Sequence, residues 1–311
     1  MSRAFLVLLF TLHAVNADLS RYSDLVVADP LNSSSDPGAV RVTYLGTNGY
    51  QIAAGGRSLL IDPYFSRISM ARAGLGWPVR PDPARINEGM AHLAGRIDAV
   101  LITHAHFDHL LDAPSIAQRS NCRLAGSSTA VELAIRAGVN RGRCIAVKPG
   151  AVRQLGQWRV QALTASHDRV PMMGVPYDRP LGNNGPPRRA SDWVCGEPLS
   201  YLISVDDVRI YIDSGGTPDL LPPTNLGRVD LAILGVALSD SRTRYAAAVQ
   251  RLQPRYVLPS HQDNFFQPLS KGFRFGPLTD FEFVRRTHMQ RHLPGRLILM
   301  DYFRPWTIPR R

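Results

Sequence analysis

The chain has 311 residues, of which 44% are hydrophobic, and it carries a formal net charge of +11 at pH 7. This composition excludes a disordered, collagen-like or coiled-coil protein, and the length suits one large globular domain. The positive charge comes almost wholly from dispersed arginines, not from a basic arm, so it does not predict a nucleic-acid-binding protein.

Residues 1–17 show the pattern of a short secretory signal. Arg3 precedes an apolar run at 4–12, and a small-residue end suits cleavage after Ala17. The apolar run is too short to span a bilayer, and no later segment is long and apolar enough to do so. We therefore expect a secreted or periplasmic protein whose single domain covers 18–311. The alternative is a hydrophobic N-terminal strand or helix.

Strands are expected first, followed by a long loop and a buried strand. Apolar and alternating runs separated by turn pairs such as Asn48-Gly49 predict an antiparallel meander. Residues 66–87 contain Gly, Pro and Trp and predict a loop. A helical pattern begins at Asp112, and a second helix is expected with Ser128 as its N-cap. The predicted strands lie at 40–46, 50–54, 58–63 and 98–104, and the second helix lies at 128–138.

The second half of the chain repeats this alternation of strands and helices. Asp206-Asp207 predicts a tight hairpin between two of its strands. The predicted strands lie at 144–147, 158–165, 199–205, 208–214, 229–235, 255–261 and 295–301, and the helices at 241–252 and 279–292. Strand-rich halves followed by helices favour two mixed sheets packed face to face, with helices on the outer faces.

The chain has three cysteines, Cys122, Cys144 and Cys195, and none belongs to a C-x-x-C pair. A zinc site built on thiolates is therefore not expected. In an oxidising compartment Cys122 and Cys144 could form a disulfide. Three buried free thiols are the equal alternative.

The segment 100–113, "VLITHAHFDHLLDA", places three histidines and an aspartate at the end of a buried strand. Alternate side chains of an extended segment point the same way, so His104 and His106 can bind one ion together. Asp108 and His109 follow where the chain turns, and they can reach a neighbouring position. Burying these groups without a metal would be costly, so the segment predicts a metal site.

Other ligands must come from elsewhere in the chain. His167, Asp213 and His261 each end a predicted strand, as the main motif does, and this shared placement makes all three candidate ligands. Asp62 also ends a strand. We expect it to orient a ligand histidine rather than to bind metal, although it could instead cap a turn.

These motifs, in the order "LLIDP", "THAHFDH", "TASH", "YIDSGG" and "LPSH", resemble the metallo-β-lactamase superfamily of metal-dependent hydrolases. The resemblance covers nearly the whole chain after the signal and implies an α+β fold, a four-layer αβ/βα sandwich with the site at one edge of the two sheets. It implies that Asp213 bridges two divalent metal ions. It also implies that His104, His106 and His167 bind the first ion, and that Asp108, His109 and His261 bind the second.

Asp213 gives a finer expectation. In β-lactamases of this superfamily the matching position is usually Cys or Ser, so Asp213 favours the esterase, lactonase, thioesterase and phosphodiesterase branches. "LLIDPYFSR" followed by "THAHFDHLLD" is most similar to the branch that contains N-acylphosphatidylethanolamine-hydrolysing phospholipase D and related bacterial proteins.

The predicted chemistry is hydrolysis by a hydroxide that bridges two divalent ions. Zinc is the default metal, with iron or manganese as alternatives. Asp108 is expected to orient the hydroxide and to relay a proton to the leaving group.

The expected substrate is a small or lipid-like phosphodiester, with peripheral membrane contact possible. Two loops after the ligands His167 and His261 carry the aromatic, apolar and cationic side chains that suit it, although they could equally be surface loops whose aromatic side chains pack onto the domain. These are Met172, Met173, Tyr177, Arg188, Arg189, Trp193, Phe265, Phe266, Lys271 and Arg274. A carboxylic ester or lactone such as an acyl-homoserine lactone is the alternative, and a β-lactamase or a metal-dependent binding protein is less favoured.

Overall fold

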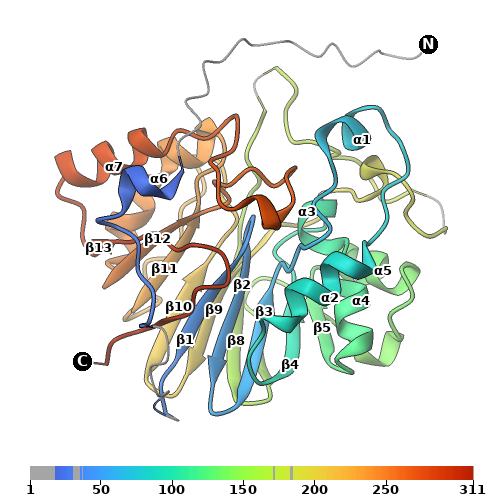
Figure 1. Ribbon diagram of the computed structural model, residues 1–311, viewed down its shortest axis with the longest axis horizontal. Coiled ribbons are helices and arrows are strands. Elements are labelled where there is room, and N and C mark those ends of the chain that lie inside the picture. Colours follow the sequence, from blue (N-terminus) through green and yellow to red (C-terminus); the bar gives the residue numbers. More distant parts are fainter. Residues whose placement is uncertain (1–17, 31–35, 37, 171, 183–184, 311) are drawn as a thin grey trace.

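The computed structural model of the chain describes residues 18–30, 36, 38–170, 172–182 and 185–310. The predicted signal at 1–17 lies outside the described residues. The first of two seven-stranded sheets has the order β14-β1-β2-β3-β4-β5-β6 (Figure 1). Its strands are β1 (Arg41–Gly46), β2 (Gly49–Ala54), β3 (Arg57–Ile61), β4 (Arg96–Leu101), β5 (Arg123–Gly126), β6 (Cys144–Ala146) and β14 (Trp306–Thr307).

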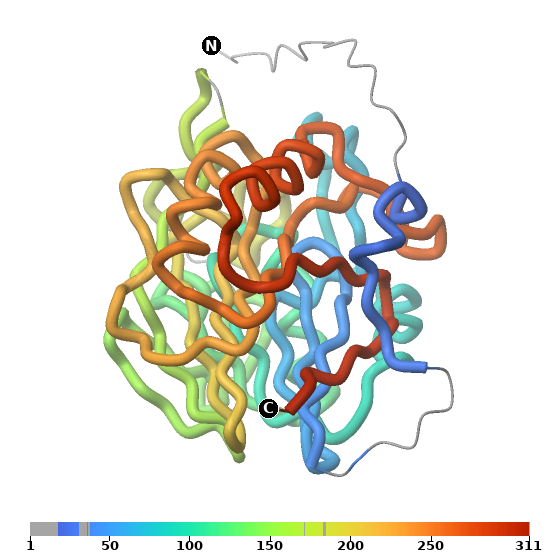
Figure 2. The backbone as a smooth tube through the Cα atoms, turned by 90° about the vertical axis from the view of Figure 1, so that its left-hand side faces the viewer, coloured from blue at the N-terminus to red at the C-terminus, as the bar shows by residue number. Residues whose placement is uncertain are grey.

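The second sheet also has seven strands, in the order β13-β12-β11-β10-β9-β8-β7. These are β7 (Val152–Leu155), β8 (Trp158–Thr164), β9 (Leu199–Val205), β10 (Val208–Ile212), β11 (Leu231–Gly235), β12 (Tyr256–Ser260) and β13 (Arg296–Leu297). The C-terminal segment runs from β13 in this sheet to β14 in the first sheet, and Figure 2 shows it crossing between them.

Helices cover the outer faces of both sheets (Figure 1). The first sheet carries α2 (Pro83–Ala91), α3 (Phe107–Leu110), α4 (Ala113–Arg119) and α5 (Ser128–Arg136), whereas α1 (Met70–Gly74) lies beyond the ends of the strands and buries no residue. The second carries α6 (Ser239–Leu252) and α7 (Phe281–Gln290). Single 3₁₀ turns lie at Leu19–Tyr22, Arg141–Arg143, Ala190–Asp192 and Leu269–Lys271.

Three apolar layers hold these parts together. In β3, Leu59 and Ile61 point into the layer between the two sheets, whereas Leu60 points to the layer beneath α2, α4 and α5. In β11, Ile233 faces the other sheet and Leu234 faces α6 and α7. Strands that are buried on both faces need near-continuous apolar runs, which these sequences supply. The order helix, sheet, sheet, helix confirms the predicted αβ/βα sandwich.

The parallel strands set the position of the site. β3 and β4 are parallel, and so are β10, β11 and β12, so each set ends at one edge of its sheet. Polar residues that follow these strands therefore gather at a common edge, as the sequence suggested.

The structure differs from the expectations in local detail. The segment predicted as the loop 66–87 contains α1 and the first five residues of α2, which Asp82 caps by accepting hydrogen bonds from two backbone amides. The N-cap of α5 is Ser127, not Ser128. The last predicted strand shrinks to two residues in β13.

All three cysteines are free thiols in the structure, but only Cys122 and Cys195 are buried as the second alternative expected, whereas Cys144 is half-buried. Burial raises the pKa of Cys122 to about 11, so this thiol stays protonated at neutral pH. Within the described part of the chain, no helix combines the length and apolar character needed to cross a membrane.

Candidate metal centre

The loop after β4 carries the main ligand motif. Beyond β4 the chain bends at Thr103 and His104, and His106 then serves as the N-cap residue of the short helix α3. The start of this helix separates the motif into two parts. His104 and His106 stay together, whereas Asp108 and His109 turn towards a neighbouring position.

The first ligand group is His104, His106 and His167, whose donor atoms all lie within 4.8 Å of one another. His104 Nε2 is 3.0 Å from His106 Nδ1. The second ring nitrogen of His106 lies 2.8 Å from the Pro176 carbonyl, and that of His167 lies 2.7 Å from the Asp168 carbonyl. A carbonyl can only accept, so these nitrogens carry the protons and the other nitrogen of each ring is left with a free lone pair for a metal.

The second ligand group is Asp108, His109 and His261. Its three donor atoms form a nearly regular triangle: His109 Nε2 to His261 Nε2 is 3.2 Å, His261 Nε2 to Asp108 Oδ2 is 3.3 Å, and His109 Nε2 to Asp108 Oδ2 is 3.5 Å. A tetrahedral ion with bonds of about 2.0–2.1 Å separates its ligands by about 3.3 Å. The donor set and its spacing therefore fit a divalent ion such as zinc.

Asp62 stands behind the second group. Its Oδ2 atom is 2.8 Å from His109 Nδ1, and it also accepts hydrogen bonds from Asn48 and from the hydroxyl of Thr103. This is the contact that an orienting role requires, because it leaves Nε2 of His109 without a proton and facing the group. Thr103 lies between the groups, 3.2 Å from His104 Nδ1. Sequence reasoning missed it, although its polar side chain at the strand end was a usable signal.

The two groups adjoin, since the rings of His104 and His109 are 3.9 Å apart. Burial, reinforced by neighbouring histidines, lowers the pKa of His106 to about 3, and burial lowers the pKa of His167 to about 4. Burial raises the pKa of Asp108, but His109 and His261 outweigh it and hold this pKa well below its usual range. At neutral pH His106, His167 and Asp108 are thus in the protonation states that metal binding requires, whereas Asp108 and Asp62 raise the pKa of His109, whose proton a bound ion must displace.

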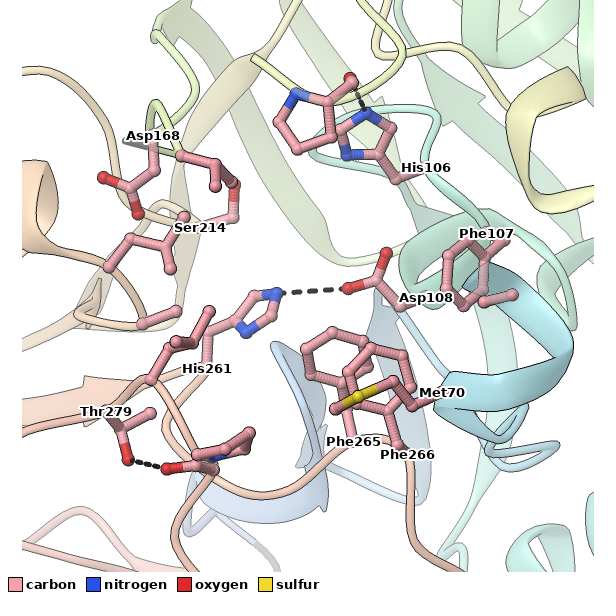
Figure 3. Close-up of a pocket in the computed structure, with 18 of the residues that line it drawn as sticks. Met70, His106, Phe107, Asp108, Asp168, Ser214, His261, Phe265, Phe266 and Thr279 are labelled. Carbon is pink, nitrogen blue, oxygen red and sulfur yellow. Dashed lines mark hydrogen bonds and ion pairs between the residues drawn. The ribbon is translucent and has the colours of Figure 1, made fainter. Parts of the chain in front are cut away.

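A cavity of about 290 Å³ opens over these groups. Figure 3 shows Asp108 and His261 facing each other on its floor, with Phe265, Phe266 and Met70 on one side. Tyr177, Leu238, Pro277 and Leu278 complete much of the apolar wall. None of the described residues that line the cavity is a lysine or an arginine.

The loops that were predicted to shape substrate choice thus contribute unequally. Their residues Tyr177, Phe265 and Phe266 line the cavity, but Arg188, Arg189, Lys271 and Arg274 do not, and Trp193 is buried beneath the outer helices. Met172 and Met173 are exposed and also lie outside the cavity lining, so the apolar part of the prediction agrees with the structure for three residues only, and the cations lie elsewhere.

Comparison with known proteins places this geometry in a family. The family model described as "Beta-lactamase superfamily domain" matches residues 41–261, which span all the motifs named above. The chain belongs to the metallo-β-lactamase superfamily. Among its relatives, a UPF0173 metal-dependent hydrolase from Anaeromyxobacter dehalogenans is 28% identical over 239 residues, 73% of this chain and 76% of the relative.

Two further comparisons complete this picture of the superfamily member. A protein named probable L-ascorbate-6-phosphate lactonase from Salmonella gallinarum is 28% identical over 181 residues, 54% of this chain and 49% of that protein. A solved metallo hydrolase from the archaeon Ignicoccus hospitalis shares the fold, with a TM-score of 0.58 at 18% identity over 88% of this chain and 100% of that one. The narrower resemblance to the phospholipase D branch stays a prediction.

Asp213 of this superfamily member lies outside the two ligand groups, and Arg244 binds one of its oxygens at 2.9 Å. The bridging role of Asp213, and the distinction from β-lactamases that rested on it, stay predictions.

Proposed function

We propose that this chain is a dinuclear metal-dependent hydrolase that cleaves neutral carboxylic esters or lactones. The single observation that carries the proposal is an apolar, cation-free cavity built directly over two adjoining ligand groups. Zinc is the proposed metal because the donors are imidazoles and one carboxylate with tetrahedral spacing.

The residues of the site have different roles in the proposed reaction. When bound, two divalent ions supply a hydroxide near neutral pH and stabilise negative charge on the reacting oxygens. Asp108 is ionised and lies on the cavity floor, 3.3 Å from His261, so its second oxygen can hold and orient the nucleophile and later accept a proton. Phe265 and Phe266, whose rings are 4.1 Å apart, exclude water from one side of the reacting bond.

The cavity favours an acyl substrate over a phosphodiester. A phosphodiester keeps a negative charge throughout the reaction, and proteins usually bind such groups with arginine or lysine. This cavity offers neither among its described residues, whereas its wall suits an acyl chain. The lactonase name of one relative fits the same class of bond. Met70 and Leu278, which are 52% and 53% exposed at the cavity, suit an amphiphilic substrate and peripheral contact with lipid.

Export is a separate part of the proposal. It rests on the signal-like pattern at 1–17 and on the absence of any later membrane-spanning pattern in the sequence. Mass spectrometry of protein recovered from the periplasm or medium tests it. A mature chain that begins at Asp18 is expected, and an intact chain confined to the cytoplasm would contradict export.

A substrate panel tests the proposed activity. Metal-loaded protein is assayed with p-nitrophenyl esters of increasing chain length, a lactone, bis-p-nitrophenyl phosphate and a chromogenic cephalosporin. We expect the esters or lactone to be hydrolysed fastest, with His106→Ala and Asp108→Asn lowering kcat/KM by about 10³-fold or more.

His288→Gln is the matched control in this assay. His288 is buried like the ligand histidines but bonds to Tyr245 and Gly295 away from the site, so its replacement should leave turnover intact. Faster hydrolysis of the phosphodiester would contradict the substrate class, and full activity of the His106 variant would contradict the metal centre.

A further inference from the structure

Both carboxylate oxygens of Asp213 accept hydrogen bonds from protein donors, on the side of β10 that faces α6. Oδ1 accepts hydrogen bonds from the backbone amides of Gly215 and Gly235, at 3.1 and 3.2 Å. Oδ2 accepts from the Tyr211 hydroxyl at 3.0 Å and from Arg244 at 2.9 Å. The carboxylate is completely buried, and these four donors supply the hydrogen bonds of both its oxygens.

Arg244 fixes the direction in which Asp213 points. Its side chain is 5% exposed and its counter-charge is Asp213. Burial lowers the pKa of Arg244, but the charge of Asp213 outweighs this effect, so the guanidinium stays charged. Turning Asp213 towards the histidines would leave a buried arginine without its partner, which is a costly arrangement.

The next residue, Ser214, points the opposite way, into the cavity (Figure 3). Its Oγ atom is 3.3 Å from His104 Nδ1. The backbone cannot easily shift to exchange the two side chains, because a Cβ atom on Gly235 would already collide with the backbone of Ser214 and Gly215. The chain thus passes tightly against β11 at this point, and that contact holds the two neighbours on opposite sides.

The hydrogen-bond roles at Ser214 follow from the ligand geometry. When Nε2 of His104 serves as a metal ligand, the proton of this ring is on Nδ1, where it is shared between the hydroxyl oxygens of Thr103 and Ser214. Because Ser214 accepts this bond, its own hydrogen is free to point into the cavity.

We infer that Ser214, and not Asp213, is the residue that this strand presents to the metal centre. On the proposed hydrolase function, the Ser214 hydroxyl donates a hydrogen bond to the substrate oxygen on which negative charge develops. Asp213 holds the framework through Arg244. The centre then has no bridging carboxylate, and two divalent ions face a single ligating carboxylate, Asp108, so the more weakly held ion is readily exchanged.

Zinc titration of the metal-free, full-length protein tests this assignment in three variants. Asp213→Asn is expected to bind as many zinc ions as the wild type but to melt at a lower temperature. Ser214→Asp would place a carboxylate against Nδ1 of His104 and is expected to tighten the zinc site that His104 serves at least about tenfold. Ser214→Ala is expected to bind zinc as the wild type does, with kcat/KM for an ester lowered about tenfold or more.

Asp230→Asn is the matched control for Asp213→Asn. Asp230 is a buried aspartate before β11, at the opposite end of the sheet, where it accepts a hydrogen bond from the Arg209 amide. It should lose stability without any change in zinc binding. Loss of one zinc ion in Asp213→Asn alone would overturn the inference.

If Asp213→Asn fails to fold, the zinc titration of Ser214→Asp is sufficient as a test. An affinity of this variant for both zinc ions equal to that of the wild type would overturn the inference. The zinc measurements need no substrate. If the expected zinc pattern appears but no ester or lactone is hydrolysed, the proposed function fails while the assignment of Ser214 to the centre stands.

Discussion

The two ligand groups differ in what stands behind their histidines. In the first group, His106 and His167 donate to backbone carbonyls, which carry no net charge. In the second, His109 donates to the carboxylate of Asp62, and Asp108 is itself a ligand. The second group therefore concentrates negative charge, and we expect it to hold its ion more tightly than the first.

A third carboxylate, Asp213, lies close in the chain to the centre but stands behind neither group. We expect Arg244→Met to show this most strongly, by lowering the free energy of unfolding by about 3–5 kcal/mol, since it leaves Asp213 buried without a counter-charge. Urea unfolding monitored by circular dichroism measures the loss. A change below about 1 kcal/mol would show that Asp213 has another partner, such as a metal.

The role of Asp62 gives the next largest effect. Asp62→Asn removes the negative charge behind His109, and we expect zinc affinity at the second group to fall about 10–100-fold while the first group keeps its affinity. Competition with a chromogenic chelator resolves the two sites. Equal weakening of both sites would remove the distinction between the groups.

Proton binding offers a third test, on metal-free protein. The buried His106 has a pKa of about 3, against about 6.5 in the unfolded chain. The unfolded state therefore binds the proton first, so stability falls as pH drops from about 6.5 towards 3. His106→Gln lacks this pH-dependent contribution to stability. The free energy of unfolding of the wild type should therefore fall relative to that of the variant over that pH range.

The comparison with the variant is needed because other groups act in the opposite direction. Burial raises the pKa of Asp112 and of Asp168 to about 6. Their contribution is complete below about pH 4 and is lost as pH rises through 6, in wild type and variant alike. A stability difference between wild type and variant that does not change with pH would contradict the buried, neutral state of His106.

The smallest effect is expected at Thr103, which contacts both groups. Thr103→Val keeps the shape of the side chain but removes its hydrogen bonds to Asp62 and His104. Zinc affinity at both groups should fall only a few-fold, with about 1–2 kcal/mol lost in stability. An effect confined to one group would show that Thr103 serves only that group.

Much of the fold and of the ligand set could be read from local pattern. Apolar runs such as Val100–Ile102 identify buried strands, and the alternation of an extended chain pairs His104 with His106. His167 and His261 could be found because they also follow strands, and strand ends meet at one edge of a sandwich.

The direction of a side chain at a strand end could not be read in this way. Asp213 and Ser214 are adjacent, and the choice between them depends on Arg244, which lies on a helix 31 residues beyond Asp213. The same holds for Arg188 and Lys271, which are near ligands in sequence but do not line the cavity. Only the packing of distant elements decides which face such a residue reaches.

The most direct test of the account is the zinc content of the wild-type protein during titration from the metal-free state. We predict that about two zinc ions bind per chain in two resolvable steps, and that ester hydrolysis rises with occupancy of the weaker site. Binding of about one ion, or full activity with the weaker site empty, would contradict the account.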